Sequence, residues 1–229
     1  EEYQARCNKA RKLMEKKGLK GIFISDGMNY TYFSGGNRDF SYSRPQVMLL
    51  PPKSEPMAFT QLFPCWNRVR EIWFDDVRIY DTMLGVPIDM VVEGMKEKGM
   101  DEGRVGVELG YEVRMGMSPN DFTKLKEALP RVEFVDASDL FWEIRMIKSP
   151  AEIARNRRAC EITVKAYETL YPSLHEGMSE IEIIERFQRL HVMLGGSNPF
   201  GIIASGPENY ESVGGGPYPR RIKKVTSCG

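Results

Sequence analysis

The chain has 229 residues, 41% of them hydrophobic and 28% charged, which is typical of a soluble globular protein with a sizeable core. Lys plus Arg and Asp plus Glu both total 32, so no net charge attracts the chain to nucleic acid or to an anionic membrane. No apolar run approaches the roughly 18 residues of a spanning helix, and the first residues are charged rather than signal-like. We therefore expect a cytoplasmic protein, with neither nucleic acid nor a membrane as a partner.

Short apolar runs alternate with amphipathic segments over the first part of the chain. Helices are expected over residues 2–17, 29–33, 87–98 and 119–128, and strands over 22–24, 46–50, 57–61, 77–80, 105–108 and 132–135. Gly18 ends the first helix, and Ser118 with Asp121 forms a near capping box for the last one. This alternation predicts an α/β layer domain with a mainly buried sheet.

Residues 133–153 mark the boundary of that domain. They read as the end of a strand, a short helix with Leu140, Phe141, Ile144 and Ile147 on an apolar side, and then a complete helix start. Ser149 and Glu152 can form a capping box, and Pro150 occupies the first helical position, where no N–H is needed. We expect a domain over residues 1–147 and a second one beginning at Lys148 and running to residue 229.

Two long helices are expected to open the second domain. The first begins at Pro150 and carries Ile153, Cys160, Val164, Tyr167 and Tyr171 along one side. The second begins after a capping box of Ser179 and Glu182, with Ile183, Ile184, Phe187 and Leu190 facing inward. A strand is expected at 201–204, and residues 206–229 read as loop, so this domain has no complete sheet.

The four cysteines and two histidines predict no metal site by themselves. Cys7, Cys65, Cys160 and Cys228 form no close pair, which argues against a zinc knuckle and a disulfide framework. We expect His191 in a core or at a helix end, and His175 in solvent, because a metal site needs several convergent donors. Asp75 and Asp76 are adjacent on a strand and point to opposite faces, so capping or ion pairing is expected of them.

Several motifs, in one order, resemble the creatinase, prolidase and aminopeptidase P superfamily of pita-bread metallohydrolases. They are Asn29–Gly35, Trp73–Asp76 with Tyr80, Gly106–Glu108, Phe134–Ser138, Arg145–Pro150 with Glu152 and Ile153, and Glu176–Glu180. The resemblance implies a creatinase-type N-terminal domain, with a mixed sheet flanked by helices, followed by an incomplete α+β pita-bread domain. It also implies a homodimer.

The superfamily's catalysis depends on a pair of divalent metals, Mn, Co or Zn, held by two Asp, one His and two Glu. All of these ligands would follow the residues present, because the family continues with Gly-Asp where this chain has Val225–Gly229. The resemblance therefore implies one of three cases: the chain is a fragment, residues are missing from it, or its gene is truncated. We expect no metal site, no catalytic residue and no hydrolysis from the chain alone.

The resemblance places its substrate-binding residues in the loop 37–45. In creatinase this loop reaches over the partner's active site with an aromatic residue and, two positions on, an arginine that meets the substrate carboxylate; Tyr42 and Arg44 match that pattern. A guanidinium offers two parallel hydrogen bonds to a carboxylate. The alternative is that Arg44 pairs with a nearby acid. Arg38, Asp39 and Phe40 are weaker candidates.

Two functional hypotheses remain. The first is a metal-dependent hydrolase that cleaves a C–N bond in a small carboxylate-bearing amide or a short Xaa-Pro peptide, of which these residues are the N-terminal portion. The family's histidine before the first metal-binding strand is absent from 210–217, which weakens a proline-peptidase assignment. The second is a catalytically inactive binding or dimerisation module.

Overall fold

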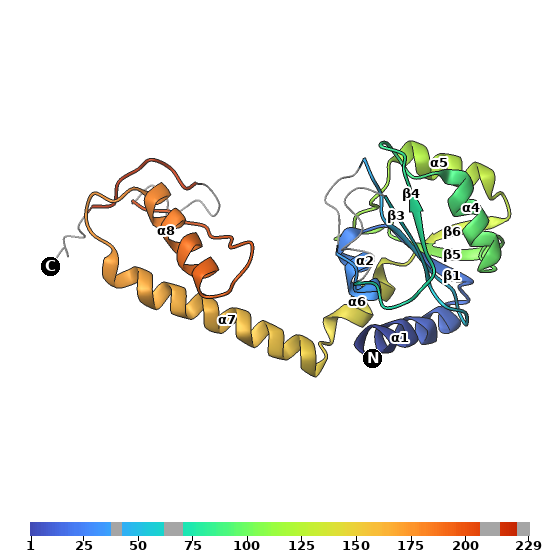
Figure 1. Ribbon diagram of the computed structural model, residues 1–229, viewed down its shortest axis with the longest axis horizontal. Helices are drawn as coiled ribbons and strands as arrows, with labels where there is room; N and C mark the ends of the chain where they lie inside the picture. The colour runs from blue at the N-terminus through green and yellow to red at the C-terminus, as the bar shows by residue number, and fades with distance from the viewer. Residues whose placement is uncertain (38–42, 62–70, 207–215, 224–229) are drawn as a thin grey trace. The chain divides into compact units, whose positions relative to one another are not determined.

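The computed structural model describes residues 1–37, 43–61, 71–206 and 216–223, and they form two compact units, Glu1–Ile147 and Lys148–Gly229 (Figure 1). Among the described residues, no helix combines the length and apolar character that crossing a bilayer requires.

Unit 1 is built on a mixed six-stranded sheet in the order β4-β3-β2-β1-β5-β6. The strands are β1 (Gly21–Ile24), β2 (Val47–Leu50), β3 (Met57–Gln61), β4 (Val77–Tyr80), β5 (Gly103–Val107) and β6 (Val132–Asp136). Strand β2 pairs antiparallel with β1 and β3, whereas β1 with β5, β5 with β6, and β3 with β4 are parallel. The predicted strands are therefore present, within two residues at their ends.

Helices cover both faces of this sheet (Figure 1). One layer contains α1 (Glu2–Lys17), α2 (Gly27–Ser34) and α6 (Ser138–Met146), and the other contains α4 (Ile88–Glu97) and α5 (Pro119–Ala128). Side chains alternate between the two cores: Ile22 and Ile24 of β1 face the first layer, and Phe23 faces the second. Because β1, β2 and β3 are buried on both faces, their sequences are apolar runs rather than alternating patterns.

Local signals in the sequence begin and end several of these helices. Gly18 ends α1 with a φ of 64°, and Asp26 begins α2 by accepting hydrogen bonds from the backbone N–H groups of Met28 and Asn29. Ser118 begins α5 by accepting from the N–H of Asp121, as predicted. In α6 the apolar side is buried except at Ile147, which follows the helix and is 72% exposed, contrary to its expected place on that side.

Unit 2 consists mainly of α7 (Pro150–Leu170), a short 3-10 helix η1 (Tyr171–Ser173) and α8 (Glu180–Met193). Both predicted capping boxes are present, Ser149 with Glu152 and Ser179 with Glu182. The inward face predicted for α8 is confirmed, because Ile183, Ile184 and Phe187 are buried and Leu190 packs against their cluster.

The apolar side predicted for α7 is wrong. Ile162, Ala166 and Leu170 are the buried residues of this helix, whereas Val164 is 55% and Tyr171 61% exposed. The helix has two apolar stripes, and α8 packs against the one with Ala166 and Leu170, while Tyr167 of the predicted stripe lies at the edge of this contact, with its ring centroid 4.8 Å from that of Phe187. The strand expected at 201–204 is also absent from the described residues, because that segment has no partner strand there.

Candidate functional site

The described ends of the loop 37–46 are held by polar contacts to the sheet. Gln46 Nε2 donates to the carbonyl of Asn37 at 3.2 Å, which closes the base of the loop. The hydroxyl of Tyr80, at the end of β4, donates to the carbonyl of Pro45 at 2.5 Å. The N–H of Gly85 donates to the carbonyl of Ser43 at 2.8 Å. These contacts fix the backbone on both sides of Arg44.

Arg44 is partly buried, and its Nε atom has no hydrogen-bond partner among the described residues. No ion pair to its guanidinium is found in the same part of the chain, so the expected alternative of pairing with a nearby acid finds no support in the described residues. A guanidinium that has a free Nε among the described residues and is held by a fixed backbone suits a carboxylate ligand. Tyr42, Arg38, Asp39 and Phe40 lie outside the described residues.

A second unpartnered polar atom lies beside this loop. The Tyr30 side chain is fully buried, and its hydroxyl has no hydrogen-bond partner in the described structure. A Cβ added at Gly36 would lie 3.3 Å from Cε1 of Tyr30, so the ring packs directly beneath the start of the loop. Burial raises the pKa of Tyr30, and the hydroxyl stays protonated as a hydrogen-bond donor.

The polar centre of unit 1 is Glu108, at the end of β5. One carboxylate oxygen accepts from the backbone N–H groups of Ser25 and Asp26, each at 2.8 Å, and the other accepts from Asn29 Nδ2 at 2.8 Å. Burial raises the pKa of Glu108 to about 7, against the opposing effect of these hydrogen bonds. The carboxylate joins β5 to the start of α2, so we assign Glu108 a structural role, which the sequence motif alone did not reveal.

The histidines take the places expected from the sequence, whereas Asp75 and Asp76 precede β4 and do not lie on a strand as expected. His191 packs against Phe187 with ring centroids 5.8 Å apart, and its Nε2 lies 3.4 Å from Thr163 Oγ1; His175 is exposed. Asp76 forms an ion pair with Lys98 at 2.7 Å. Within the described ranges, no three or more His, Cys, Asp or Glu side chains are grouped so as to hold a metal ion.

Residues 6–147 match the family model of the Creatinase/Prolidase N-terminal domain, and the chain belongs to this family. It is 26% identical over 214 residues to an ectoine hydrolase of Halomonas elongata, covering 90% of this chain and 52% of that protein. It is 25% identical over 190 residues to a creatinase of a Bacillus species, covering 80% and 43%. The chain thus spans about half the length of the curated relatives that it matches.

Solved structures share the fold. A prolidase from Thermococcus sibiricus superposes with a TM-score of 0.81 at 24% identity, over 98% of this chain and 59% of the other. The dipeptidase PepE from Mycobacterium ulcerans gives a TM-score of 0.76 at 22% identity, over 97% and 57%. The predicted fold class is confirmed: a mixed-sheet N-terminal domain followed by part of the pita-bread domain.

Proposed function

We propose that these residues form the N-terminal domain, and the first part of the catalytic domain, of a metal-dependent hydrolase that cleaves a C–N bond in a small carboxylate-bearing amide or short peptide. The family match and the hydrolases among the relatives support this reaction class. The observation that carries the substrate class is the partly buried Arg44, whose Nε has no hydrogen-bond partner among the described residues.

In this proposal Arg44 binds the substrate carboxylate. Its Nε and terminal nitrogens present a planar fork of donors, which matches the two oxygens of a carboxylate. The contacts at Pro45 and Ser43 hold its backbone, so less conformational entropy is lost when the ligand binds. Tyr42 is proposed as the aromatic wall of the same site, and a homodimer is proposed in which this loop serves the partner's active site.

The described residues offer no complete donor set for the expected pair of divalent metals, so we assign them no metal-dependent step. Their proposed contribution is to bind and orient the substrate. Binding energy from a group remote from the scissile bond aligns that bond for attack.

The test uses the form of the protein that carries a metal-binding domain after these residues. Hydrolysis of an Xaa-Pro dipeptide, of creatine and of ectoine is measured, together with the KM, for the wild type and for Arg44→Ala. We expect one of these substrates to be cleaved, and Arg44→Ala to raise its KM about tenfold or more because a charge-assisted bidentate contact is lost. Bound metal, measured by elemental analysis, should not change.

Arg131→Ala is the matched control, because Arg131 pairs with Asp101 at 2.8 Å and lies outside the loop. An unchanged KM in Arg44→Ala would remove Arg44 from the site. If no substrate is cleaved while carboxylate ligands still bind through Arg44, the chain functions instead as a binding module.

A further inference from the structure

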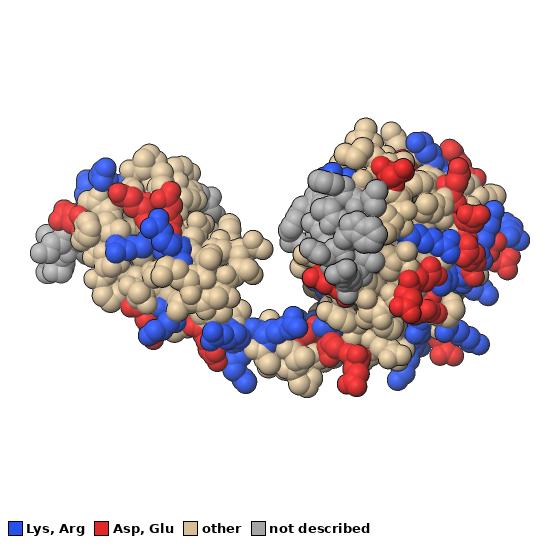
Figure 2. All heavy atoms as spheres, in the orientation of Figure 1, with Lys and Arg blue, Asp and Glu red and all other residues tan. Residues whose placement is uncertain are grey.

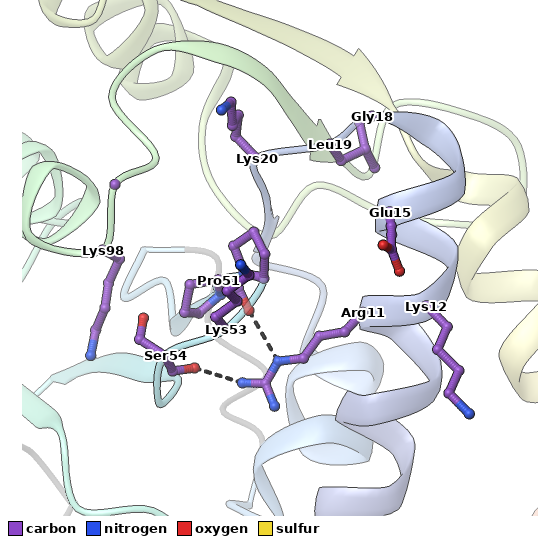
Figure 3. Close-up of a pocket in the computed structure, with 12 residues that line it drawn as sticks. Arg11, Lys12, Glu15, Gly18, Leu19, Lys20, Pro51, Lys53, Ser54 and Lys98 are labelled. Atoms are coloured by element: carbon purple, nitrogen blue, oxygen red, sulfur yellow. Dashed lines mark hydrogen bonds between the residues drawn. The ribbon is translucent and has the colours of Figure 1, made fainter.

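A second concave surface of unit 1 is strongly basic. It is a cavity of about 690 Å³ where the C-terminal half of α1, the turn after β2 and the end of α4 meet (Figure 3). Among the described residues its lining has one carboxylate, Glu15, and five cationic side chains, which are Arg11, Lys12, Lys20, Lys53 and Lys98. The charges of the chain balance overall, and the face of unit 1 seen in Figure 2 has Lys and Arg interspersed with Asp and Glu, so this excess of positive charge is local. None of these residues belongs to the loop that carries Arg44.

Two of the five cations already have partners. Arg11 donates from Nε to the carbonyl of Pro51 at 3.1 Å and from Nη2 to the carbonyl of Ser54 at 2.6 Å, as the dashed lines in Figure 3 show. It therefore holds the turn after β2 against α1. Lys98 is paired with Asp76. These contacts give the cavity a fixed wall.

The other three, Lys12, Lys20 and Lys53, have neither a hydrogen bond nor an ion pair with the described residues. The α1 helix dipole does not explain why these three lysines are there. Its C-terminal end already has Lys16 and Lys17 in the last turn, and neither Lys20 nor Lys53 lies in a helix. In Figure 3, Lys12 and Lys20 extend from the rim with their amino groups turned outward. A lysine stem has four rotatable bonds, so these groups can turn inward onto a ligand.

The remaining wall is apolar and is formed by Leu19, Pro51 and Pro52. We propose that the cavity binds a small phosphorylated organic molecule, with its phosphate held by the three unpaired lysines and its apolar part against these residues. A lysine ammonium is a point charge suited to phosphate. The cavity volume lies within the range of about 300–1,000 Å³ that is usual for small-molecule sites. Glu15 can accept a hydrogen bond from a hydroxyl or amino group of the same ligand.

The test measures binding of two probes, ADP and pyrophosphate, by titration calorimetry at constant ionic strength. We expect the wild-type chain to bind at least one of them. The triple variant Lys12→Gln, Lys20→Gln, Lys53→Gln should bind about tenfold or more weakly, because three charge contacts to phosphate are lost. The matched control replaces Lys124, Lys126 and Lys165 by Gln, which removes the same charge outside the cavity and should leave the affinity unchanged. Thermal melting checks that both variants are folded.

If the wild type binds ADP but not pyrophosphate, the result supports the proposal and assigns part of the affinity to the organic portion of the ligand. Equal affinity for both probes, lost only in the cavity variant, supports recognition through the phosphates. No binding of either probe to the wild type overturns the proposal. An equal loss in both triple variants also overturns it, because the attraction would then follow total charge rather than the cavity.

Discussion

Asn29 donates a hydrogen bond from Nδ2 to Oε1 of Glu108 at 2.8 Å, between two side chains that are 0% and 2% exposed. Asn29 Oδ1 in turn accepts from Nη1 of Arg145 at 2.9 Å. A chain of polar contacts, buried at Glu108 and Asn29 and partly buried at Arg145, thus joins β5, α2 and α6.

The first prediction concerns the pH dependence that Glu108 gives to folding. Burial raises its pKa in the folded chain from 4.5 to about 7, so between these values the folded state holds a proton that the unfolded state has lost. The contribution of Glu108 to the free energy of unfolding is therefore full below pH 4.5 and falls as the pH rises toward 7. Glu108→Gln cannot ionise and should lack this fall. Urea unfolding at pH 5 and pH 7.5 measures this difference in the free energy of unfolding for both proteins.

Glu127→Gln is a suitable control for that experiment, since Glu127 is exposed on α5. If the wild type and Glu108→Gln change by the same amount between the two pH values, the carboxyl of Glu108 does not titrate in this range.

The second prediction concerns Arg145. Arg145→Ala leaves the buried Oδ1 of Asn29 without its donor, and an unsatisfied buried acceptor costs about 1–3 kcal/mol. We expect a loss of that size in the free energy of unfolding from urea titration. Arg155→Ala, on the exposed side of α7, should change it by less than about 0.5 kcal/mol. Equal effects of the two substitutions would contradict the stabilising contact between Arg145 and the buried Asn29.

The third prediction concerns Gly116, which closely approaches Ser25, the residue after β1. A Cβ at this position would lie 1.9 Å from the carbonyl oxygen of Ser25, and the N–H of Gly116 donates to Ser25 Oγ at 3.0 Å. Backbone atoms cannot move aside cheaply, so Gly116→Ala should destabilise unit 1 by about 2 kcal/mol or more.

Gly99→Ala provides the comparison for Gly116. Gly99 has a φ of 65° but open space around its Cβ position, so its substitution should cost only about 1 kcal/mol from backbone strain. Thermal denaturation of both variants ranks the two effects. A smaller loss for Gly116→Ala than for Gly99→Ala would show that the segment before α5 shifts freely.

The fourth prediction concerns Glu180, at the start of α8. Its carboxylate accepts from the N–H of Ser205 at 2.8 Å and from the N–H of Tyr218 at 2.9 Å, joining two segments of unit 2. Burial by itself raises the pKa of Glu180, but the hydrogen bonds from Ser205 and Tyr218 outweigh it and lower the pKa below its ordinary value. The stabilisation is therefore present near neutral pH and is lost as the pH falls through the folded pKa.

Glu180→Ala should raise amide hydrogen exchange at Ser205 and Tyr218, and it should cost about 1–3 kcal/mol because both donors lose their acceptor. Glu185→Ala, in the same helix but on its exposed face, should leave exchange at both amides unchanged. Unchanged exchange at both amides in Glu180→Ala would show that the carboxylate of Glu180 does not hold these two segments together.

Features encoded by neighbouring residues could be predicted from the sequence. The capping boxes at Ser149 and Ser179 depend on residues three positions apart, and the apolar runs of β1, β2 and β3 indicate burial without knowledge of their partners. The family resemblance identified Arg44 as a candidate, since a motif is also a local pattern.

Features that depend on distant partners could not be predicted. Nothing in the sequence of α7 shows that α8 covers Ile162, Ala166 and Leu170 rather than Val164 and Tyr171, because both stripes are apolar at helical spacing. The missing strand at 201–204 is a similar case, since a strand forms only where another strand pairs with it.

The sequence by itself therefore determined the helix ends, the buried strands and the family, because these follow from residue type and short spacing. Only the tertiary structure decided that Glu108 is the buried polar centre, that Arg44 Nε has no partner among the described residues, and that basic residues from separate segments line one cavity. Each of these depends on side chains that folding brings together from distant positions.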